Sequence, residues 1–260
     1  MNNIISLICI AGSHMKFTMR RTMMIFILLI QPLFFVLLTW LIYRHTDSAG
    51  TGTRIFIASG LTTLWSGIVF SSLSDLERER SMGTLELIFA SAHGLKGAVI
   101  PKTAGNLFLC VLPMTGLWAG IHYVLNRPVI IYDPWKTAIS AMILLISLFS
   151  ISLFLSCFFA LSRNSRVIMN AFEFPFFLIS GFVFPITVLP DWLRILSWLS
   201  PLTYPVHLLR SAMLGETVFL TWNGLFVISI SLILLFMCLT FFAFNIIEKS
   251  TRISGVFTLS

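Results

Sequence analysis

The sequence predicts an all-α membrane protein that crosses the bilayer six times, and three observations support this fold class. Of the 260 residues, 57% are hydrophobic and only 10% are charged, with a mean hydropathy of +0.95. Soluble domains contain roughly a quarter charged residues, so this composition indicates an integral membrane protein. The apolar residues also form six long segments, and Lys and Arg are divided unequally between the two sides. We expect a single transmembrane domain over residues 1–260.

Six segments have the length of a membrane span. A spanning helix needs about 20 mostly apolar residues, because each residue advances the helix by about 1.5 Å. The segments are Thr22–Tyr43, Ile55–Ser74, Thr103–Val124, Thr137–Ser162, Val167–Leu189 and Asn223–Ile247.

Lys and Arg set the predicted orientation. Eleven of them fall on the side that holds both termini and six fall on the other, which accounts for all 17. Cytoplasmic loops are enriched in Lys and Arg, so we expect both termini and residues 75–102 in the cytoplasm. The same rule explains the formal net charge of +7, and we expect no nucleic-acid partner.

The first 21 residues do not read as a span. Apolar residues recur there every three to four positions, which is typical of a helix that lies in the membrane interface. These residues are Ile4, Ile8, Ala11, Met15 and Met19. The alternative is a frayed tail that touches lipid. We favour the interfacial helix.

Residues 190–214 form a second exception. Pro190, Pro201 and Pro205 interrupt the apolar pattern, and the segment contains aromatic residues of the kind that anchor at headgroup level. We expect one or two short re-entrant helices on the outer face, packed on the fifth and sixth spans. Asp191 directly after Pro190 indicates a helix start, because an acid is favourable at the positive end of the helix dipole.

A dense charged segment lies between the second and third spans. About a third of all acidic and basic residues fall between Asp75 and Lys102. Charge is costly in hydrocarbon, so this segment must face water or a partner. An amphipathic helix on the inner membrane surface would explain it without a partner. Glutamates on a surface facing anionic lipid favour docking to a protein, and the residues alone leave both interpretations open.

Two motifs carry a resemblance to a known family. Residues 77–87, ERERSMGTLEL, resemble the cytoplasmic motif between the second and third spans of ABC type-2 transporter permeases. The segments SGFVFPI at 180–186, LPDWL at 189–193 and SPLTY at 200–204 are similar to that family's link between the fifth and sixth spans. The six-span plan, the interfacial helix and the outer helices also fit, so the resemblance covers nearly the whole chain.

The resemblance implies a permease half that pairs with a second copy or a paralogue and with ATP-binding-cassette ATPase subunits. The sequence contains no GxxxxGK[ST] phosphate-binding loop, so we expect no catalytic residue here and assign ATP and Mg to the partner ATPase. Residues 75–93 would be a cytoplasmic coupling helix. The coupling residues implied are Glu77, Arg78, Glu79, Arg80, Gly83, Thr84 and Glu86. Gly83 would permit close backbone approach to the ATPase.

A carboxyl group within the predicted fifth span marks a candidate substrate pathway. An intramembrane acid suggests either contact with a polar part of the substrate or a structural bond to Arg163, Arg166 or Asn170. We favour the structural bond. Aromatic residues surround this acid and would line a path or pack against neighbouring helices. The pathway candidates are Glu173, Phe172, Phe176 and Phe177.

The remaining motifs are less specific. The four cysteines and five histidines are scattered without metal-ligand spacing, so we expect no metal site. Ser59, Thr63, Ser66 and Gly67 give the second span a face of small residues, which suits close helix packing and is a candidate seam between two permease halves.

The leading hypothesis is therefore the permease subunit of an ATP-driven exporter. The bulky aromatics and scarce charges favour an amphipathic or hydrophobic cargo, such as a drug, lipid, lipid-linked glycan or peptide. One alternative is a non-transporting membrane partner on the same scaffold, such as a sensor or immunity protein. Another is a small membrane enzyme, although the acids of the outer loops are dispersed. We expect a multi-pass protein of a bacterial inner or plasma membrane.

Overall fold

The computed structural model describes residues 2–45, 50–84, 87–88, 94–161, 167, 173, 175–183, 186–215 and 221–254, and these are almost entirely helical with no strand. The chain begins with α1 (Asn2–Met19), α2 (Thr22–Ile25), the π-helical η1 (Phe26–Ile30), α3 (Gln31–Tyr43) and α4 (Thr51–Ser81). It continues with α6 (Gly94–Val111), α7 (Pro113–Ala119), the π-helical η2 (Gly120–Val124) and α8 (Pro134–Leu161). The last elements are the 3-10 helix η3 (Ile186–Val188), α10 (Asp191–Leu199), α11 (Thr203–Leu214) and α12 (Trp222–Ser254).

Five of these helical stretches are long and apolar enough to cross a membrane. They are Thr22–Tyr43, Thr51–Ser72, Gly94–Val124, Pro134–Cys157 and Trp222–Ile247. The first, second, third, fourth and sixth predicted spans each coincide with one of them, with the first matching at both ends. The chain is therefore a multi-pass membrane protein.

The fifth predicted span lies partly outside the described residues, and its predicted end at Leu189 is wrong. The described helix there stops after Ile179. Gly181 adopts a φ of +74°, which glycine reaches without a steric penalty. The Phe182 N–H donates to the Phe177 carbonyl at 3.2 Å, which closes the helix end. The chain therefore turns ten residues earlier than the apolar pattern indicates.

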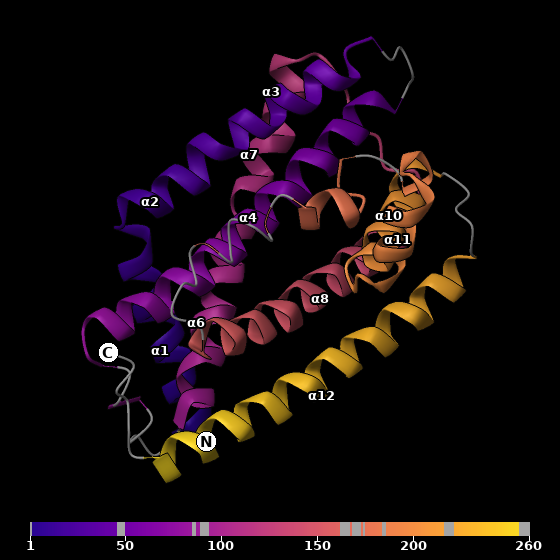
Figure 1. Cartoon of the computed structure of the whole chain (residues 1–260). Coiled ribbons are helices and arrows are strands. Elements are labelled where there is room, and N and C mark those ends of the chain that lie inside the picture. Colours follow the sequence, from indigo (N-terminus) through magenta and orange to yellow (C-terminus); the bar gives the residue numbers. More distant parts are fainter. Residues whose placement is uncertain are drawn as a thin grey trace.

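The long helix α4 lies at the centre of the bundle and packs against α3, α6, α8 and α11 (Figure 1). Small residues allow this close packing. A Cβ at Gly67 would lie 2.6 Å from the Cys110 Sγ of α6. Ser59, Thr63 and Ser66 are each at most 2% exposed. This face therefore packs within the chain, and the predicted seam with a second permease half does not lie here.

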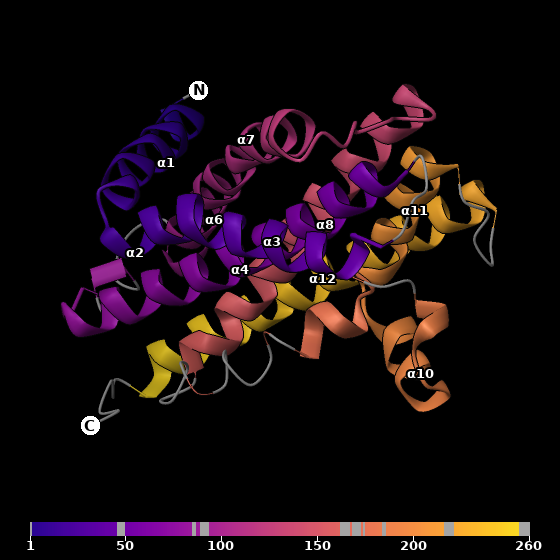
Figure 2. The ribbon, with the colours of Figure 1, turned by 90° about the horizontal axis from the view of Figure 1, so that it is seen from above.

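The short helices α10 and α11 confirm that residues 190–214 are helical rather than spanning. Asp191 is the first residue of α10, as predicted, and pairs with Arg194 at 3.1 Å. The two helices lie at the end of the bundle opposite to α1, and α10 projects away from the long helices (Figure 2). Helix α11 packs against the predicted sixth span, α12, and also against α8.

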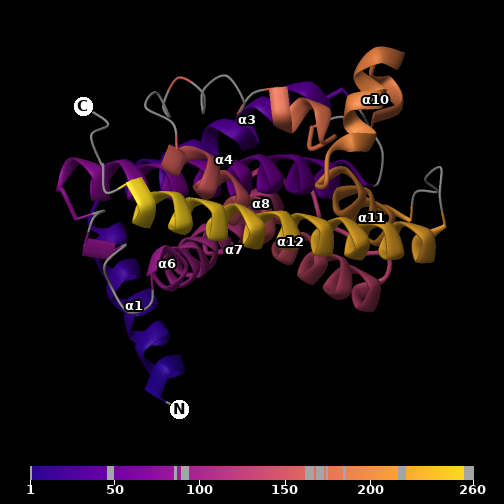
Figure 3. The ribbon, with the colours of Figure 1, turned by 60° about the horizontal axis from the view of Figure 1, so that its bottom comes forward.

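Helix α1 leaves the bundle at a steep angle to the long helices, at the end where α12 finishes (Figure 3). It packs on α6 where that helix carries a glycine: a Cβ at Gly105 would lie 3.0 Å from the Met15 Cγ and 3.3 Å from the Ala11 carbonyl. The predicted apolar face therefore contributes to packing within the chain. Next to it, the polar residues His14 and Thr18 are also buried.

Candidate functional site

A buried carboxylate near the end of α4 ties three elements together. The Asp75 Oδ2 accepts a hydrogen bond from the Asn106 Nδ2 of α6 at 2.8 Å and lies 2.9 Å from the His14 Nε2 of α1. The Asp75 Oδ1 accepts a hydrogen bond from Arg21, between α1 and α2, at 2.8 Å. Because these residues come from distant parts of the sequence, the end of α4, the second half of α6 and the N-terminal segment are fixed to one another.

The partners of Asp75 also hold it in its charged form. Burial acts to raise the pKa of this carboxyl, but the hydrogen bonds and the charge of the surrounding groups outweigh it. The pKa of Asp75 therefore lies below its ordinary value. The main opposing contribution comes from His14, followed by Asn106 and Arg21. We call these four residues, His14, Arg21, Asp75 and Asn106, the Asp75 clamp.

One helical turn further along α4, Glu79 makes a second link to α6. Its Oε1 accepts a hydrogen bond from the Lys102 Nζ at 2.5 Å, and its Oε2 accepts one from the Thr84 hydroxyl. Partial burial acts to raise the pKa of Glu79, and these two partners more than offset it, so the pKa lies below its ordinary value. Glu79 is thus bonded within the chain.

The predicted coupling helix over residues 75–93 is not one separate helix. Residues 75–81 are the last two turns of α4, and the chain leaves the helix direction at Gly83, which has a φ of +67°. The Met82 N–H donates to the Arg78 carbonyl at 2.9 Å, and the Thr84 N–H donates to the Glu79 carbonyl at 3.0 Å. Helices commonly end at a glycine in the left-handed conformation, where N–H groups just beyond the helix donate hydrogen bonds to its last carbonyls. Residues 85–86 and 89–93 lie outside the described residues.

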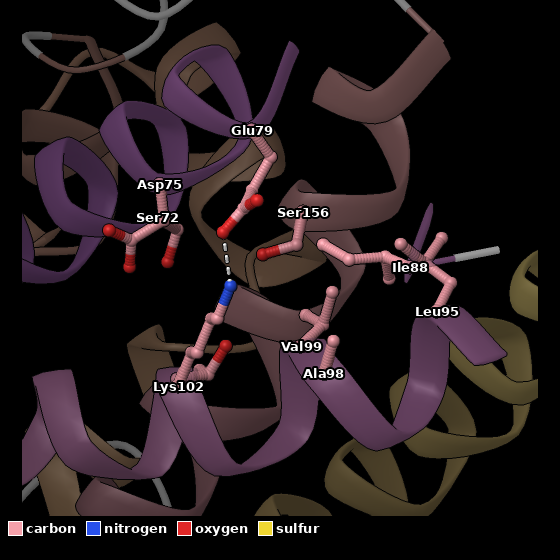
Figure 4. A pocket seen from close by; sticks show the side chains of 10 residues that line it. Ser72, Asp75, Glu79, Ile88, Leu95, Ala98, Val99, Lys102 and Ser156 are labelled. Carbon is pink, nitrogen blue, oxygen red and sulfur yellow. Dashed lines mark hydrogen bonds and ion pairs between the residues drawn. The ribbon is translucent and has the colours of Figure 1, made fainter. Parts of the chain in front are cut away.

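Two cavities adjoin this end of α4. The smaller one has a volume of about 20 Å³, enough for about one water molecule, and lies beside the Glu79–Lys102 pair. Figure 4 shows Lys102 reaching from α6 towards Glu79. Asp75 and Ser72 lie on one side of this pair, and Ser156 and Ile88 lie on the other. The larger one is an open cleft of about 470 Å³ between α1 and the end of α4, and its lining includes apolar Phe17 and charged Arg78.

The other predicted coupling residues are placed as follows. Arg78 and Arg80 are partly exposed on the last turns of α4. Glu77 also lies on α4, but its side chain is outside the described residues, as is all of Glu86. Gly83 is exposed, and a Cβ there would meet nothing within 4 Å. Its backbone conformation, rather than a close approach within the chain, explains the glycine.

Of the predicted pathway residues, three are described and all three contact other residues of the chain. Glu173 is 4% exposed, and its Oε1 accepts a hydrogen bond from the Ser66 hydroxyl of α4 at 2.6 Å. The ring of Phe176 stacks on Trp65, with centroids 4.7 Å apart, and Phe177 meets Phe35 edge to face. Phe172 lies outside the described residues, as do Arg163, Arg166 and Asn170, the bonding partners proposed for Glu173. Whether Glu173 contacts a substrate stays a prediction.

Sequence reasoning missed the partners that complete the site. His14, Arg21 and Asn106 surround Asp75, and Ser66 binds Glu173, but nothing in their sequence spacing indicates these contacts. The only available signal was polarity: Asn106 and Asp75 are polar residues next to long apolar runs. Among the described residues, no three His, Cys, Asp or Glu side chains are grouped closely enough to hold a metal ion.

The described structure is thus a bundle of long apolar helices, with a central helix whose charged end is bonded to the N-terminal helix and to the third span. The chain matches the ABC-2 type transporter family over residues 7–214 and belongs to that family. The family is a membrane component of transport.

Among curated proteins, the chain is similar to the probable multidrug ABC transporter permease YbhR of Escherichia coli K12. The two are 23% identical over 171 residues, which is 64% of this chain and 44% of the relative. The same protein from Escherichia coli O157:H7 matches with the same identity and coverage. The chain therefore spans less than half the length of the curated relatives that it matches.

Proposed function

We propose that this chain is the permease half of an ATP-driven exporter, moved by a separate ATPase that binds at the charged end of α4. One observation carries the proposal most: α4 is a single helix of 31 residues that passes through the buried centre of the bundle and ends in charged residues. At 1.5 Å per residue it is about 45 Å long. Because the helix is continuous, a displacement of its charged end would be transmitted directly to the buried core.

The Asp75 clamp supports this mechanism because it makes the charged end a rigid unit. Asp75 is bonded to α6 and to the N-terminal segment, and Glu79 is bonded to α6 through Lys102. A push on the last turns of α4 would move α1 and α6 with it. We propose that Arg78 and Arg80, with Glu77 and Glu86, contact the ATPase. Glu79, Gly83 and Thr84 would hold the end of the helix in the shape that the ATPase recognises.

The remaining parts of the transporter follow from this arrangement. ATP and Mg would be bound by the partner ATPase, and a second permease copy or paralogue would complete the translocation path. Both termini and the charged end of α4 would lie in the cytoplasm, with α1 in the inner interface and α10 and α11 on the outer side. The fifth span would bring the number of spans to six, and the membrane would be a bacterial inner or plasma membrane.

The proposed cargo is amphipathic or hydrophobic: a drug, a lipid, a lipid-linked glycan or a peptide. The name of the relative, a probable multidrug permease, supports a cargo of this kind. Glu173 and Ser66 form a polar pair among aromatic rings, next to Trp65 and Phe176. We propose that such a pair, placed near the path, would accept the polar part of an otherwise apolar cargo.

A charge-reversal pull-down tests the proposal. The chain is purified from its native membranes in mild detergent, as wild type and as Arg78→Glu/Arg80→Glu, and co-purifying proteins are identified by mass spectrometry. The matched control is Lys136→Glu, at the opposite end of the bundle. We expect an ATP-binding-cassette ATPase with wild type and control, and its loss with the double reversal. Recovery of a folded wild-type chain without any ATPase would contradict the proposal. So would an ATPase that still co-purifies with the double reversal.

A further inference from the structure

An apolar groove of about 670 Å³ runs along the outside of the bundle, between the first and third spans. One wall is formed by α2, η1 and α3, and the other by α7 and η2. Among the described residues that line it, Thr115 alone has a polar side chain, and its hydroxyl already donates to the Leu112 carbonyl at 3.0 Å. The described lining of the groove thus offers water no side-chain group that is not already hydrogen-bonded.

Irregular helix geometry on both walls creates the groove. Pro32 follows the π-helical turn η1, and a proline disturbs the preceding turn because its ring clashes with an earlier carbonyl. On the other wall, Pro113 starts α7, and Gly116 and Gly120 present no side chain. A Cβ at either glycine would meet nothing within 4 Å. Both π-helical segments of the described chain line this groove, and such segments are frequent at functional sites.

The length of the groove fits one leaflet of the bilayer. Its first wall runs from Ile25 to Val36, eleven steps along the helix, or about 17 Å. That is about half of the hydrocarbon thickness of about 30 Å. A spanning helix from another protein would need the full thickness. An acyl chain of a single leaflet needs only half, so a lipid tail is the occupant that the dimensions favour.

The charges at one end of the groove indicate the headgroup. The lining begins at Met19, next to the exposed cations Lys16 and Arg20. Asp75 and Glu79, which line the cleft beside α1, are already paired with other side chains. Juxtamembrane cations attract anionic lipid headgroups. The phosphate of an anionic phospholipid would therefore find two cations at the level where its acyl chain enters the groove.

We propose that this groove binds an acyl chain of one anionic phospholipid from the surrounding bilayer, with its phosphate against Lys16 and Arg20. The bound lipid fills a space that would otherwise separate the first and third spans, and so acts as a structural part of the subunit. The inference goes beyond the transport role and does not depend on it.

Native mass spectrometry of the detergent-purified full chain tests the site. Dioleoylphosphatidylglycerol and dioleoylphosphatidylcholine are added separately at equal concentrations. We expect one tightly retained phosphatidylglycerol, bound roughly 20-fold more tightly than phosphatidylcholine, since each cation near the surface contributes about a fivefold preference. The variant Lys16→Gln/Arg20→Gln should bind both lipids alike.

A second variant fills the groove itself. Gly116→Leu/Gly120→Leu should lose both lipids and remain folded, because each Cβ has free space and leucine favours a helix over glycine. The matched control is Gly12→Leu on α1, where a Cβ also meets nothing within 4 Å, and it should retain the lipid. Lipid retention by the filled variant, or no retention by wild type, would overturn the proposal. If the filled variant loses a dimer and not a lipid, the groove binds a helix of a second copy, and the lipid proposal is wrong. The pull-down of the ATPase tests the transport role independently of this lipid site.

Discussion

Helices α4 and α12 are similar in length, but they occupy opposite environments. Helix α12 is the more apolar of the two, yet most of its spanning part faces outward, whereas that of α4 is almost completely buried. On α12, Leu234 is 64% exposed, while Trp65 of α4 is 2% exposed. The difference shows that hydrophobicity does not direct a helix to the centre of a membrane protein. In lipid, large apolar side chains face outward, and small or hydroxyl-bearing residues allow helices to pack.

The largest expected effect comes from filling the closest contact of α4. Gly67→Leu would place a Cβ 2.6 Å from the buried Cys110 Sγ, with the rest of the side chain directed into a packed interface. We expect a loss of at least about 3 kcal/mol in the free energy of unfolding, or failure to fold. Thermal unfolding in detergent measures this. Leu234→Ala on α12 is the control and should change stability by less than about 0.5 kcal/mol. Equal effects at the two positions would refute the comparison.

The next effect concerns the Asp75 clamp. Asp75→Ala would leave Arg21 without its carboxylate and Asn106 without its acceptor, at a cost of about 2–3 kcal/mol. Limited proteolysis should also release α1 from the bundle earlier than in wild type. A variant with unchanged unfolding and unchanged protease sensitivity at α1 would show that the clamp does not hold the N-terminal segment.

A smaller effect is expected where α4 ends. Gly83→Ala adds a methyl group that meets no neighbour, but a residue with a Cβ is strained at a φ of +67°. We expect a loss of about 1 kcal/mol from the backbone alone. Gly83→Asn, which tolerates this conformation better, should recover part of it. An equal loss for asparagine and alanine would point to a contact rather than to the backbone.

The smallest effect is a pH dependence at the Glu79–Lys102 pair. The folded-state pKa of Glu79 lies below its ordinary value of 4.5, so its contribution to stability is fully present above that pH. The contribution is lost as pH falls through the lowered pKa. The difference in melting temperature between wild type and Glu79→Gln should stay constant from pH 7 to pH 5 and shrink below about pH 4. A difference that grows on acidification would contradict this sign.

The sequence is sufficient to predict the ends of a span where charged residues directly flank its apolar run. The first span was predicted at both ends because Arg21 and Arg44 bound its apolar run. The second predicted span ends at Ser74, close to Ser72, where the apolar part of α4 ends, and a separate coupling helix is predicted to follow from residue 75. Helix α4 instead continues to Ser81, since its charged side chains are bonded to α1 and α6.

Contacts between distant residues could not be predicted. Asp75 and Asn106 are 31 positions apart, and Ser66 and Glu173 are 107 apart, so no local spacing links them. Gly116 and Gly120 are a different case. Their G-x-x-x-G spacing within an apolar helix is visible in the sequence, but only the structure reveals that a Cβ at either glycine would meet nothing within 4 Å.

Photo-crosslinking tests whether an ATPase binds at the charged end of α4. A photoreactive amino acid replaces Arg80 in one variant and Lys136, at the opposite end, in another, and both are irradiated in native membranes. We expect an adduct between position 80 and an ATP-binding-cassette ATPase, and none from position 136. An ATPase adduct from position 136 alone, or no ATPase adduct from position 80 in a folded chain, would contradict the proposal that α4 is driven from this end.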